Sequence, residues 1–154
     1  MLKVLIADDE EKICQLIIKL INWEEMGLKI AATASNGIEA LEQAKICKPE
    51  ILITDIRMPG IDGMELIRKV KEKLPDTEII IISGYRHFEY AQTAIRYGVR
   101  NYLLKPIKKE ELRDTLQKIA DIYREKNEQL NFEERVRLAL KMMQESCVPV
   151  LFPV

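Results

Sequence analysis

The sequence lacks three features that assign chains to specialised protein classes. Its 154 residues include only three cysteines, none in a Cys-x-x-Cys pair, so we expect neither a disulfide framework nor a zinc site. Charges of the two signs nearly cancel, at a net charge of −1, which argues against a basic surface for nucleic acid. Because no run of about 18 apolar residues occurs, we expect no membrane span. The N-terminus reaches Asp8 before a long apolar stretch develops, so we expect no secretory leader and a cytoplasmic protein.

What the sequence does contain is an alternation of strand and helix patterns. Short apolar runs alternate with segments in which apolar residues recur three and four positions apart. The expected strands lie at 3–7, 28–34, 51–54, 78–82 and 101–104. Five β–α units with short connections favour an α/β domain with a doubly wound parallel sheet. The periodicity itself does not set the order of the strands.

Four of these runs end in polar residues of different chemical types. Asp8 and Asp9 follow the first run, Asp55 the third, Ser83 the fourth and Lys105 the fifth. Because the carboxyl ends of parallel strands meet at one edge of a sheet, we expect these side chains to lie close together. Each residue alone also fits an ordinary role, such as a helix cap, a turn or a surface lysine. Their common location favours a functional site.

The chemistry of this set points to phosphoryl transfer. Three carboxylates within about 4–6 Å repel one another, by about 4 kcal/mol for a 4 Å pair at an effective dielectric constant of 20. Mg²⁺ would offset this repulsion, since it accepts a few carboxylates together with water. A carboxylate can also attack phosphorus to give an aspartyl phosphate. We therefore interpret Asp55 as the nucleophile, Asp8 and Asp9 as Mg²⁺ ligands, and Lys105 and Ser83 as partners of the phosphoryl oxygens.

Over residues 1–122 the sequence resembles the receiver domains of two-component response regulators. The matching stretches are VLIADDE at 4–10, ILITDIRMPGIDGMEL at 51–66, IIISGY at 80–85 and YLLKPI at 102–107. The resemblance implies a flavodoxin-like (CheY-like) fold with strand order 2-1-3-4-5 and a cis peptide bond before Pro106. It also implies that Asp55 accepts a phosphoryl group from a sensor histidine kinase. The domain would then be a phosphoacceptor switch that catalyses only its own phosphorylation and dephosphorylation.

The same resemblance implies roles for further residues. The backbone carbonyl of Arg57 would be a Mg²⁺ ligand beside the aspartates, and Ser83 and Tyr102 would be the switch residues. The output face would be formed by the fourth helix, fifth strand and fifth helix, where a homodimer is a candidate. The stretch SGYRHFEYAQTAIRYGVRNYLLKPI at 83–107 resembles receivers joined to AraC-type DNA-binding domains. Regulation of transcription would then need an output domain outside this chain.

Residues 123–154 are too few for such a domain, and we expect a linker helix and a C-terminal tail there. A second amphipathic helix is indicated from Phe132 to Met143. Two interpretations of the fifth helix are open, a coiled-coil dimer or a linker helix whose early apolar residues face the sheet, and we favour the second. The apolar positions concerned are Leu112, Leu116, Ile119, Tyr123 and Leu130.

The predicted fourth helix has two stripes of non-charged residues at helical spacing. We expect Phe88, Ala91 and Ile95 to face the core. The second stripe fits either a partner surface or a solvated face, and consists of Tyr90, Thr93 and Tyr97. The only histidine, His87, is expected at the surface or as a helix cap.

Two other classes of protein share parts of this pattern. Phosphatases of the haloacid dehalogenase type also combine aspartate, serine or threonine, lysine and Mg²⁺. Their nucleophile follows the first strand in an Asp-x-Asp pattern, where this chain has Asp8-Asp9-Glu10. Flavin-binding modules of the same fold need a hydroxyl- and glycine-rich phosphate cradle after the first strand. The acidic residues at 8–11 would repel phosphate there, so both alternatives are weaker.

Overall fold

The computed structural model describes residues 1–84 and 88–151, and the side chains of residues 89–145 in the second range. His87 therefore lies outside the described residues. Each predicted strand is present, with bounds within one residue of those expected. The elements are β1 (Leu2–Ala7), α1 (Glu11–Leu20), η1 (Glu24–Met26), β2 (Leu28–Ala34), α2 (Gly37–Cys47), β3 (Ile51–Thr54), α3 (Gly63–Lys73), β4 (Glu78–Ser83), α4 (Phe88–Arg96), β5 (Asn101–Leu104) and α5 (Lys109–Leu151).

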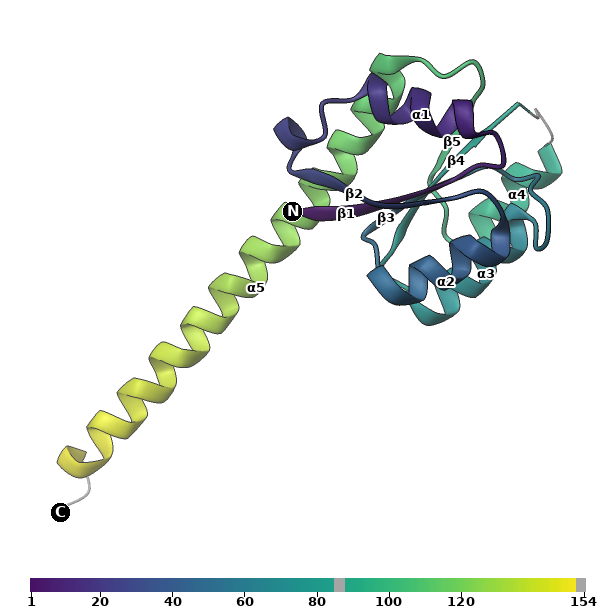
Figure 1. The fold of residues 1–154 in the computed structure, drawn as a ribbon. Helices are drawn as coiled ribbons and strands as arrows, with labels where there is room; N and C mark the ends of the chain where they lie inside the picture. The colour runs from purple at the N-terminus through teal and green to yellow at the C-terminus, as the bar shows by residue number, and fades with distance from the viewer. Residues whose placement is uncertain (85–87, 152–154) are drawn as a thin grey trace. The chain divides into compact units, whose positions relative to one another are not determined.

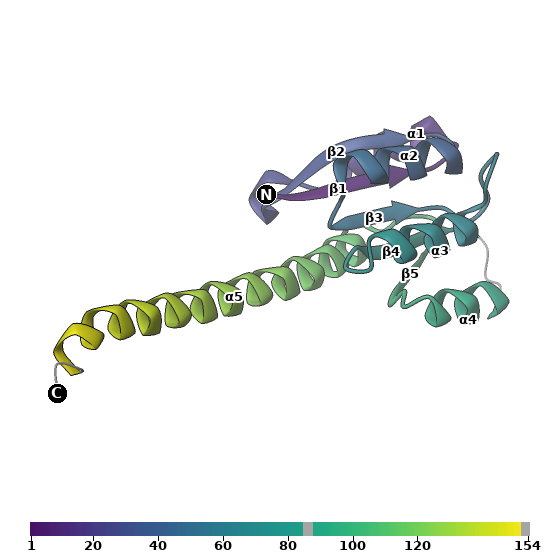
Figure 2. The same ribbon diagram turned by 90° about the horizontal axis from the view of Figure 1, so that it is seen from below.

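The five strands form one parallel sheet in the order β2-β1-β3-β4-β5, which confirms the predicted fold. Figure 1 shows α1 and the start of α5 on one face of the sheet and α2, α3 and α4 on the other. These three helices follow one another across their face in the direction from β2 to β5 (Figure 2). The sheet is therefore covered on both sides, as the right-handed crossovers of β–α units require.

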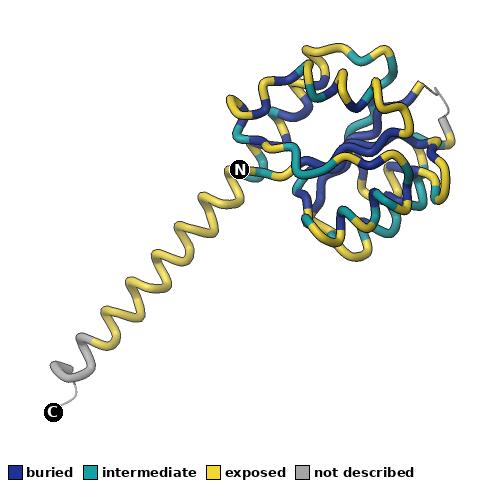
Figure 3. Tube along the Cα trace, viewed as in Figure 1, coloured by how far each residue is buried: buried dark blue, intermediate teal, exposed yellow. Residues whose placement is uncertain are grey.

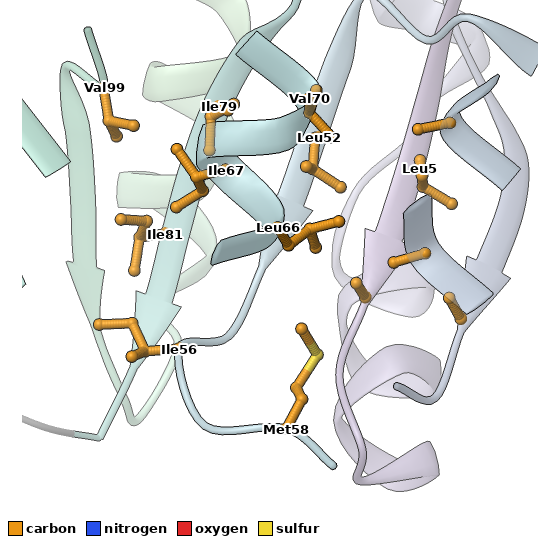
Figure 4. Close-up of a cluster of buried hydrophobic side chains, with 14 of the residues drawn as sticks. Leu5, Leu52, Ile56, Met58, Leu66, Ile67, Val70, Ile79, Ile81 and Val99 are labelled. Carbon is orange, nitrogen blue, oxygen red and sulfur yellow. The ribbon is translucent and has the colours of Figure 1, made fainter. Parts of the chain in front are cut away.

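The core lies along the central strands. The side chains of β1 from Val4 onward, and all those of β3 and β4, are buried, and in Figure 3 the buried residues concentrate in these strands. Strands covered on both faces read as continuous apolar runs, which is why the sequence predicted them well. On the α3 side, Leu66, Ile67 and Val70 pack in one cluster with strand residues that include Leu52 and Ile81 (Figure 4).

The fourth helix packs with a different face than expected. Ile95, predicted to be a core residue, is 70% exposed, whereas Ala94 is buried. Tyr90 and Tyr97 pack against the core on either side of Ala94. Both stripes of this helix have core-like spacing, so periodicity could not separate them. Tyr90, Ala94 and Tyr97 are spaced four and three residues apart, so they share the face of α4 that packs on the core.

The last helix is one element where the pattern indicated two. The separate helix expected from Phe132 is wrong, because α5 runs continuously from Lys109 to Leu151. The chain divides into two compact units, residues 1–120 and 121–154. In the first unit Leu112, Leu116 and Ile119 are buried, as the linker interpretation expected of the early residues. None of the described helices is long and apolar enough to cross a membrane.

Candidate functional site

Three aspartates meet at the carboxyl ends of β1 and β3. Ala7 of β1 pairs with Thr54 of β3, so the residues that follow these strands are neighbours. One carboxylate oxygen from each of Asp8, Asp9 and Asp55 lies within 4.8 Å of the others. Asp8 and Asp55 are buried and Asp9 is exposed. The structure thus brings together the acidic residues that the sequence had placed at one sheet edge.

Lys105 joins two of these carboxylates. Its Nζ lies 3.1 Å from Oδ2 of Asp8 and 3.0 Å from Oδ2 of Asp55. Its backbone N–H donates to the Ser83 carbonyl at 2.9 Å, which ties the residue to the end of β4. The peptide bond to Pro106 is cis, as the family resemblance implied. Burial by itself lowers the pKa of Lys105, but the hydrogen bonds and charges of Asp55 and Asp8 outweigh burial and raise this pKa.

Asp8 is held by the backbone that follows it. Its Oδ1 accepts a hydrogen bond from the Glu10 N–H at 2.9 Å. Burial raises the pKa of Asp8, and the hydrogen bonds from Glu10 and Lys105 offset this only in part. A single ammonium therefore does not fully compensate the buried carboxylates. A further positive charge at this site would therefore be electrostatically favourable.

Asp55 is fixed through both its backbone and its side chain. Its N–H donates to the Ala7 carbonyl at 3.0 Å, and its Oδ1 accepts from the Ile56 N–H at 2.7 Å. The Thr54 hydroxyl donates to the Asp55 carbonyl at 2.8 Å. A Cβ atom at Gly63 would lie only 2.1 Å from that carbonyl oxygen, so α3 can begin against Asp55 only with glycine there. The sequence pattern gave no sign of these supporting roles of Thr54 and Gly63.

Ser83 and Tyr102, the two expected switch residues, are in contact. Ser83 ends β4 and is fully buried, and Tyr102 on the neighbouring β5 is half-buried. Burial raises the pKa of the Tyr102 phenol, and a hydrogen bond with the Ser83 side chain acts in the opposite direction. A displacement of the Ser83 side chain would therefore alter its hydrogen bond with Tyr102, an aromatic residue of the edge strand β5.

Asp9 and Asp55 open onto a cleft of about 400 Å³. Asp8 supports the site from beneath and is not among the residues that line the cleft. Sequence reasoning did not assign Glu10 or Gly84 to the site, because only the folded loops bring them to its rim. The lining residues are Asp9, Glu10, Asp55, Arg57, Gly84 and Lys105.

This donor set fits a hard divalent cation. Carboxylate oxygens are the ligands that Mg²⁺ prefers, and three converge within 4.8 Å beside one lysine. The exposed Asp9 leaves part of a cation's coordination open to water, which Mg²⁺ retains readily. The cleft of about 400 Å³ beside Asp55 and Lys105 is large enough for a tetrahedral oxyanion such as phosphate. The arrangement is therefore suited to holding a phosphoryl group against a carboxylate.

Comparisons with known proteins agree with this geometry. A model of the response regulator receiver domain matches residues 4–117. An uncharacterized transcriptional regulatory protein of Bacillus subtilis, YesN, is 40% identical over 139 residues, which cover 86% of this chain and 38% of that protein. The transcriptional regulatory protein HptR of Staphylococcus aureus is 40% identical over 107 residues, or 70% of this chain and 42% of HptR. The chain thus spans about two-fifths of the length of these curated relatives.

Solved structures show the same similarity. The receiver domain of AraT, a response regulator from Geobacillus stearothermophilus, has 41% sequence identity and a TM-score of 0.78. The match covers 82% of this chain and 98% of that one. A two-component transcriptional regulator AraC from Clostridium phytofermentans has 36% identity and a TM-score of 0.73 over 79% of this chain and 94% of the other. Both matches cover nearly all of the related structure.

Proposed function

This chain belongs to the response regulator receiver family of two-component systems, and from that premise we propose that Asp55 accepts a phosphoryl group from a phosphohistidine of a sensor histidine kinase. A receiver is a signalling switch rather than a classical enzyme. One observation carries the choice of Asp55 among the three aspartates. It is the one that is both buried against Lys105 and open to the cleft, whereas Asp8 does not line the cleft and Asp9 is exposed.

The proposed transfer uses groups that are already in place. A carboxylate oxygen of Asp55 forms a bond to phosphorus as the P–N bond of the donor breaks, and the donor imidazole keeps the electron pair and takes up a proton. Lys105, which contacts Asp55 at 3.0 Å, neutralises charge on the phosphoryl oxygens. The Ile56 N–H holds the other oxygen of Asp55 in a fixed orientation. Catalysis of this kind consists mostly of positioning and charge compensation.

Receivers generally bind Mg²⁺ in an acidic pocket, and we assign that role here to Asp8, Asp9, Asp55 and the backbone carbonyl of Arg57. When bound, Mg²⁺ supplies positive charge that offsets the carboxylates and the phosphoryl oxygens. Asp8 keeps a defined orientation through the Glu10 N–H, and the exposed Asp9 would leave the site accessible to a cation from solvent.

Ser83 and Tyr102 are the proposed link from phosphorylation to the output. A phosphoryl group on Asp55 offers new acceptors to the Ser83 hydroxyl, and a shift of Ser83 changes its hydrogen bond with Tyr102. Reversing a 1:99 population needs about 5.5 kcal/mol of differential stabilisation, which several charge-assisted hydrogen bonds can supply. We place the homodimer surface on the face formed by α4, β5 and the start of α5.

The wider role is proposed from the relatives. We assign residues 1–122 to the receiver domain and residues 123–154 to a linker helix and C-terminal tail. YesN and HptR are named as transcriptional regulators, and the matched AraC structure is a two-component transcriptional regulator. These names support control of transcription, which we assign to an AraC-type DNA-binding domain outside this chain, and we propose that the protein acts in the cytoplasm. The sensor kinase would then be the partner that supplies the phosphoryl group, and DNA would be the partner of the output domain.

Labelling with radioactive acetyl phosphate in the presence of Mg²⁺ tests the proposal. The wild-type chain should incorporate the phosphoryl group, and Asp55→Asn should incorporate none. Asp62→Asn is the matched control, because Asp62 is exposed, lies on the same loop and caps α3, a role that asparagine fills equally well. Undiminished labelling of Asp55→Asn would show that the nucleophile is another residue.

A further inference from the structure

The loop of residues 55–62 carries Asp55 and Arg57, and its far side is held by α2. Gly37, the first residue of α2, donates its N–H to the Pro59 carbonyl at 3.3 Å. A Cβ atom at Gly37 would lie 2.0 Å from the Ile61 carbonyl oxygen, and Cβ atoms essentially never come closer than 3.0 Å to such an atom. The start of α2 and the loop therefore touch backbone to backbone, with no space for any side chain at Gly37.

The reason for glycine at this position is space and not conformation. The glycines with positive φ are Gly27, Gly60 and Gly98, and Gly37 is not among them. An alanine at Gly37 would be compatible with the helical backbone and would even raise helix propensity. Its only conflict is with the loop, because the two backbones would have to separate by about 1 Å. Glycine at position 37 therefore gives α2 a lower helix propensity than alanine would, and nothing within α2 itself requires glycine there.

A second contact between α2 and the loop involves Ile38. A Cβ atom at Gly60 would lie 3.1 Å from Cδ1 of Ile38, so this side chain lies directly over the loop backbone where φ is +83°. Ile38 is nevertheless 54% exposed, so it contributes little to the core. An isoleucine in this position restrains the turn at Gly60 rather than filling the interior.

The start of α2 is itself firmly held. Oδ1 of Asn36 accepts the Glu39 N–H at 2.8 Å, and Oε2 of Glu39 accepts the Ser35 hydroxyl at 3.1 Å and the Ser35 N–H at 3.3 Å. These bonds satisfy donors at the helix N-terminus from both directions. The first turn of α2 can therefore act as a fixed support against which the loop rests.

We propose that Gly37 is a positioning residue for the metal site, which acts by letting the start of α2 contact the loop that presents Asp55 and the Arg57 carbonyl. This inference rests on the proposed function, since it assumes that these groups hold Mg²⁺. Mg²⁺ demands near-ideal octahedral geometry with ligands at about 2.0–2.1 Å. A displacement of about 1 Å in the loop should therefore weaken the site strongly, although Gly37 touches neither the cation nor the phosphoryl group.

The test compares Mg²⁺ affinity, measured by calorimetry, among matched variants of α2. Gly37→Ala should weaken Mg²⁺ binding by about tenfold or more, within the range that misplacement of such groups produces. Ala44→Gly is its control, because it makes the reverse exchange at a buried position of the same helix away from the loop, and so lowers the stability of α2 without touching the loop. It should leave Mg²⁺ affinity unchanged.

A second pair of variants does not depend on whether Gly37→Ala folds. Ile38→Ala and Ile46→Ala remove the same atoms from exposed isoleucines, 54% and 75% exposed, at opposite ends of α2. Ile38→Ala should weaken Mg²⁺ binding about two- to threefold, a small fraction of the effect of misplacing the loop, and Ile46→Ala should not weaken it. The amide shifts of Met58, Gly60 and Ile61 in NMR spectra should move in Ile38→Ala and Gly37→Ala only.

The outcomes separate this inference from the proposed function. A wild-type chain that binds Mg²⁺, with Gly37→Ala or Ile38→Ala binding it equally tightly, would overturn the role of Gly37 and leave the metal site intact. Equal weakening in Ile38→Ala and Ile46→Ala would also overturn it, since the effect would then be one of general helix stability. A wild-type chain that does not bind Mg²⁺ would overturn both proposals together.

Discussion

The two edges of the sheet, at the amino and carboxyl ends of its strands, both carry buried polar side chains. At the amino edge, the Thr77 hydroxyl donates to the Pro49 carbonyl at 2.7 Å, and the buried Glu78 carboxylate pairs with Arg100 at 2.9 Å. At the carboxyl edge, Lys105 is shared by Asp8 and Asp55, with Asp9 beside them. The buried carboxylate at the amino edge has an ion-pair partner of its own, whereas at the carboxyl edge two buried carboxylates share one ammonium beside a third carboxylate.

This difference indicates which polar residues serve structure and which serve function. Buried charges that find a partner stabilise the fold or are neutral to it, whereas like charges brought together reduce its stability. A fold keeps such an unfavourable cluster where a ligand is to supply the missing charge. The comparison predicts that variants at the two edges will respond differently to Mg²⁺.

The largest effect is expected from removing the ammonium that Asp8 and Asp55 share. Lys105→Met keeps much of the side-chain volume but leaves Asp8 and Asp55 without their ammonium partner. The free energy of unfolding in EDTA should fall by about 3 kcal/mol, as when one partner of a buried ion pair is removed. Urea denaturation followed by circular dichroism measures this. A loss below about 0.5 kcal/mol, the size typical of surface substitutions, would mean that Lys105 compensates little of the negative charge.

A somewhat smaller effect is expected from the cation itself. Mg²⁺ at 100 times its dissociation constant should raise the free energy of unfolding of the wild-type chain by about 2.7 kcal/mol. The cation binds the folded state and relieves repulsion among the three aspartates. Thermal melts with Mg²⁺ and then with excess EDTA measure the gain and its reversal. If Mg²⁺ did not change the melting temperature, the three aspartates would not form a Mg²⁺ site.

The smallest expected effects are changes in the free energy of unfolding that have opposite signs at the two edges. In EDTA, Asp9→Asn should raise the free energy of unfolding by about 0.5 kcal/mol, because it removes one of three repelling charges at a solvent-exposed position. Glu78→Gln makes the same chemical change at the amino edge and should lower it by about 1 kcal/mol, because it weakens the hydrogen bond with Arg100. Only Asp9→Asn should reduce the gain from Mg²⁺. If both variants changed the free energy of unfolding in the same direction, the proposed difference in charge compensation between the two edges would be wrong.

The strands and the gathering of the site residues could be predicted because each depends on one simple rule. Strands buried on both faces are continuously apolar, and parallel strands bring their carboxyl ends to one edge. From these rules alone Asp8, Asp55 and Lys105 were expected to meet, and they do. The strand order came from the family resemblance, since periodicity contains no information about it.

Other features could not be predicted because they depend on how elements pack. Ile95 and Tyr97 lie on stripes of equal helical spacing, and only tertiary packing decides that Tyr97 contacts the core while Ile95 is exposed. Asn36 caps α2 and Gly37 begins it. The need for glycine there comes from the Ile61 carbonyl, 24 positions away in the sequence. Such close backbone contacts are not visible in local sequence patterns.

Locating the phosphoryl group tests the central claim most directly. The wild-type chain, treated with acetyl phosphate and Mg²⁺, is reduced with borohydride, which marks an acyl phosphate, and its peptides are sequenced by tandem mass spectrometry. The account predicts that the mark lies on Asp55 and on no other residue. A mark on Asp8 or Asp9, or a phosphoryl group retained on His87, would contradict it.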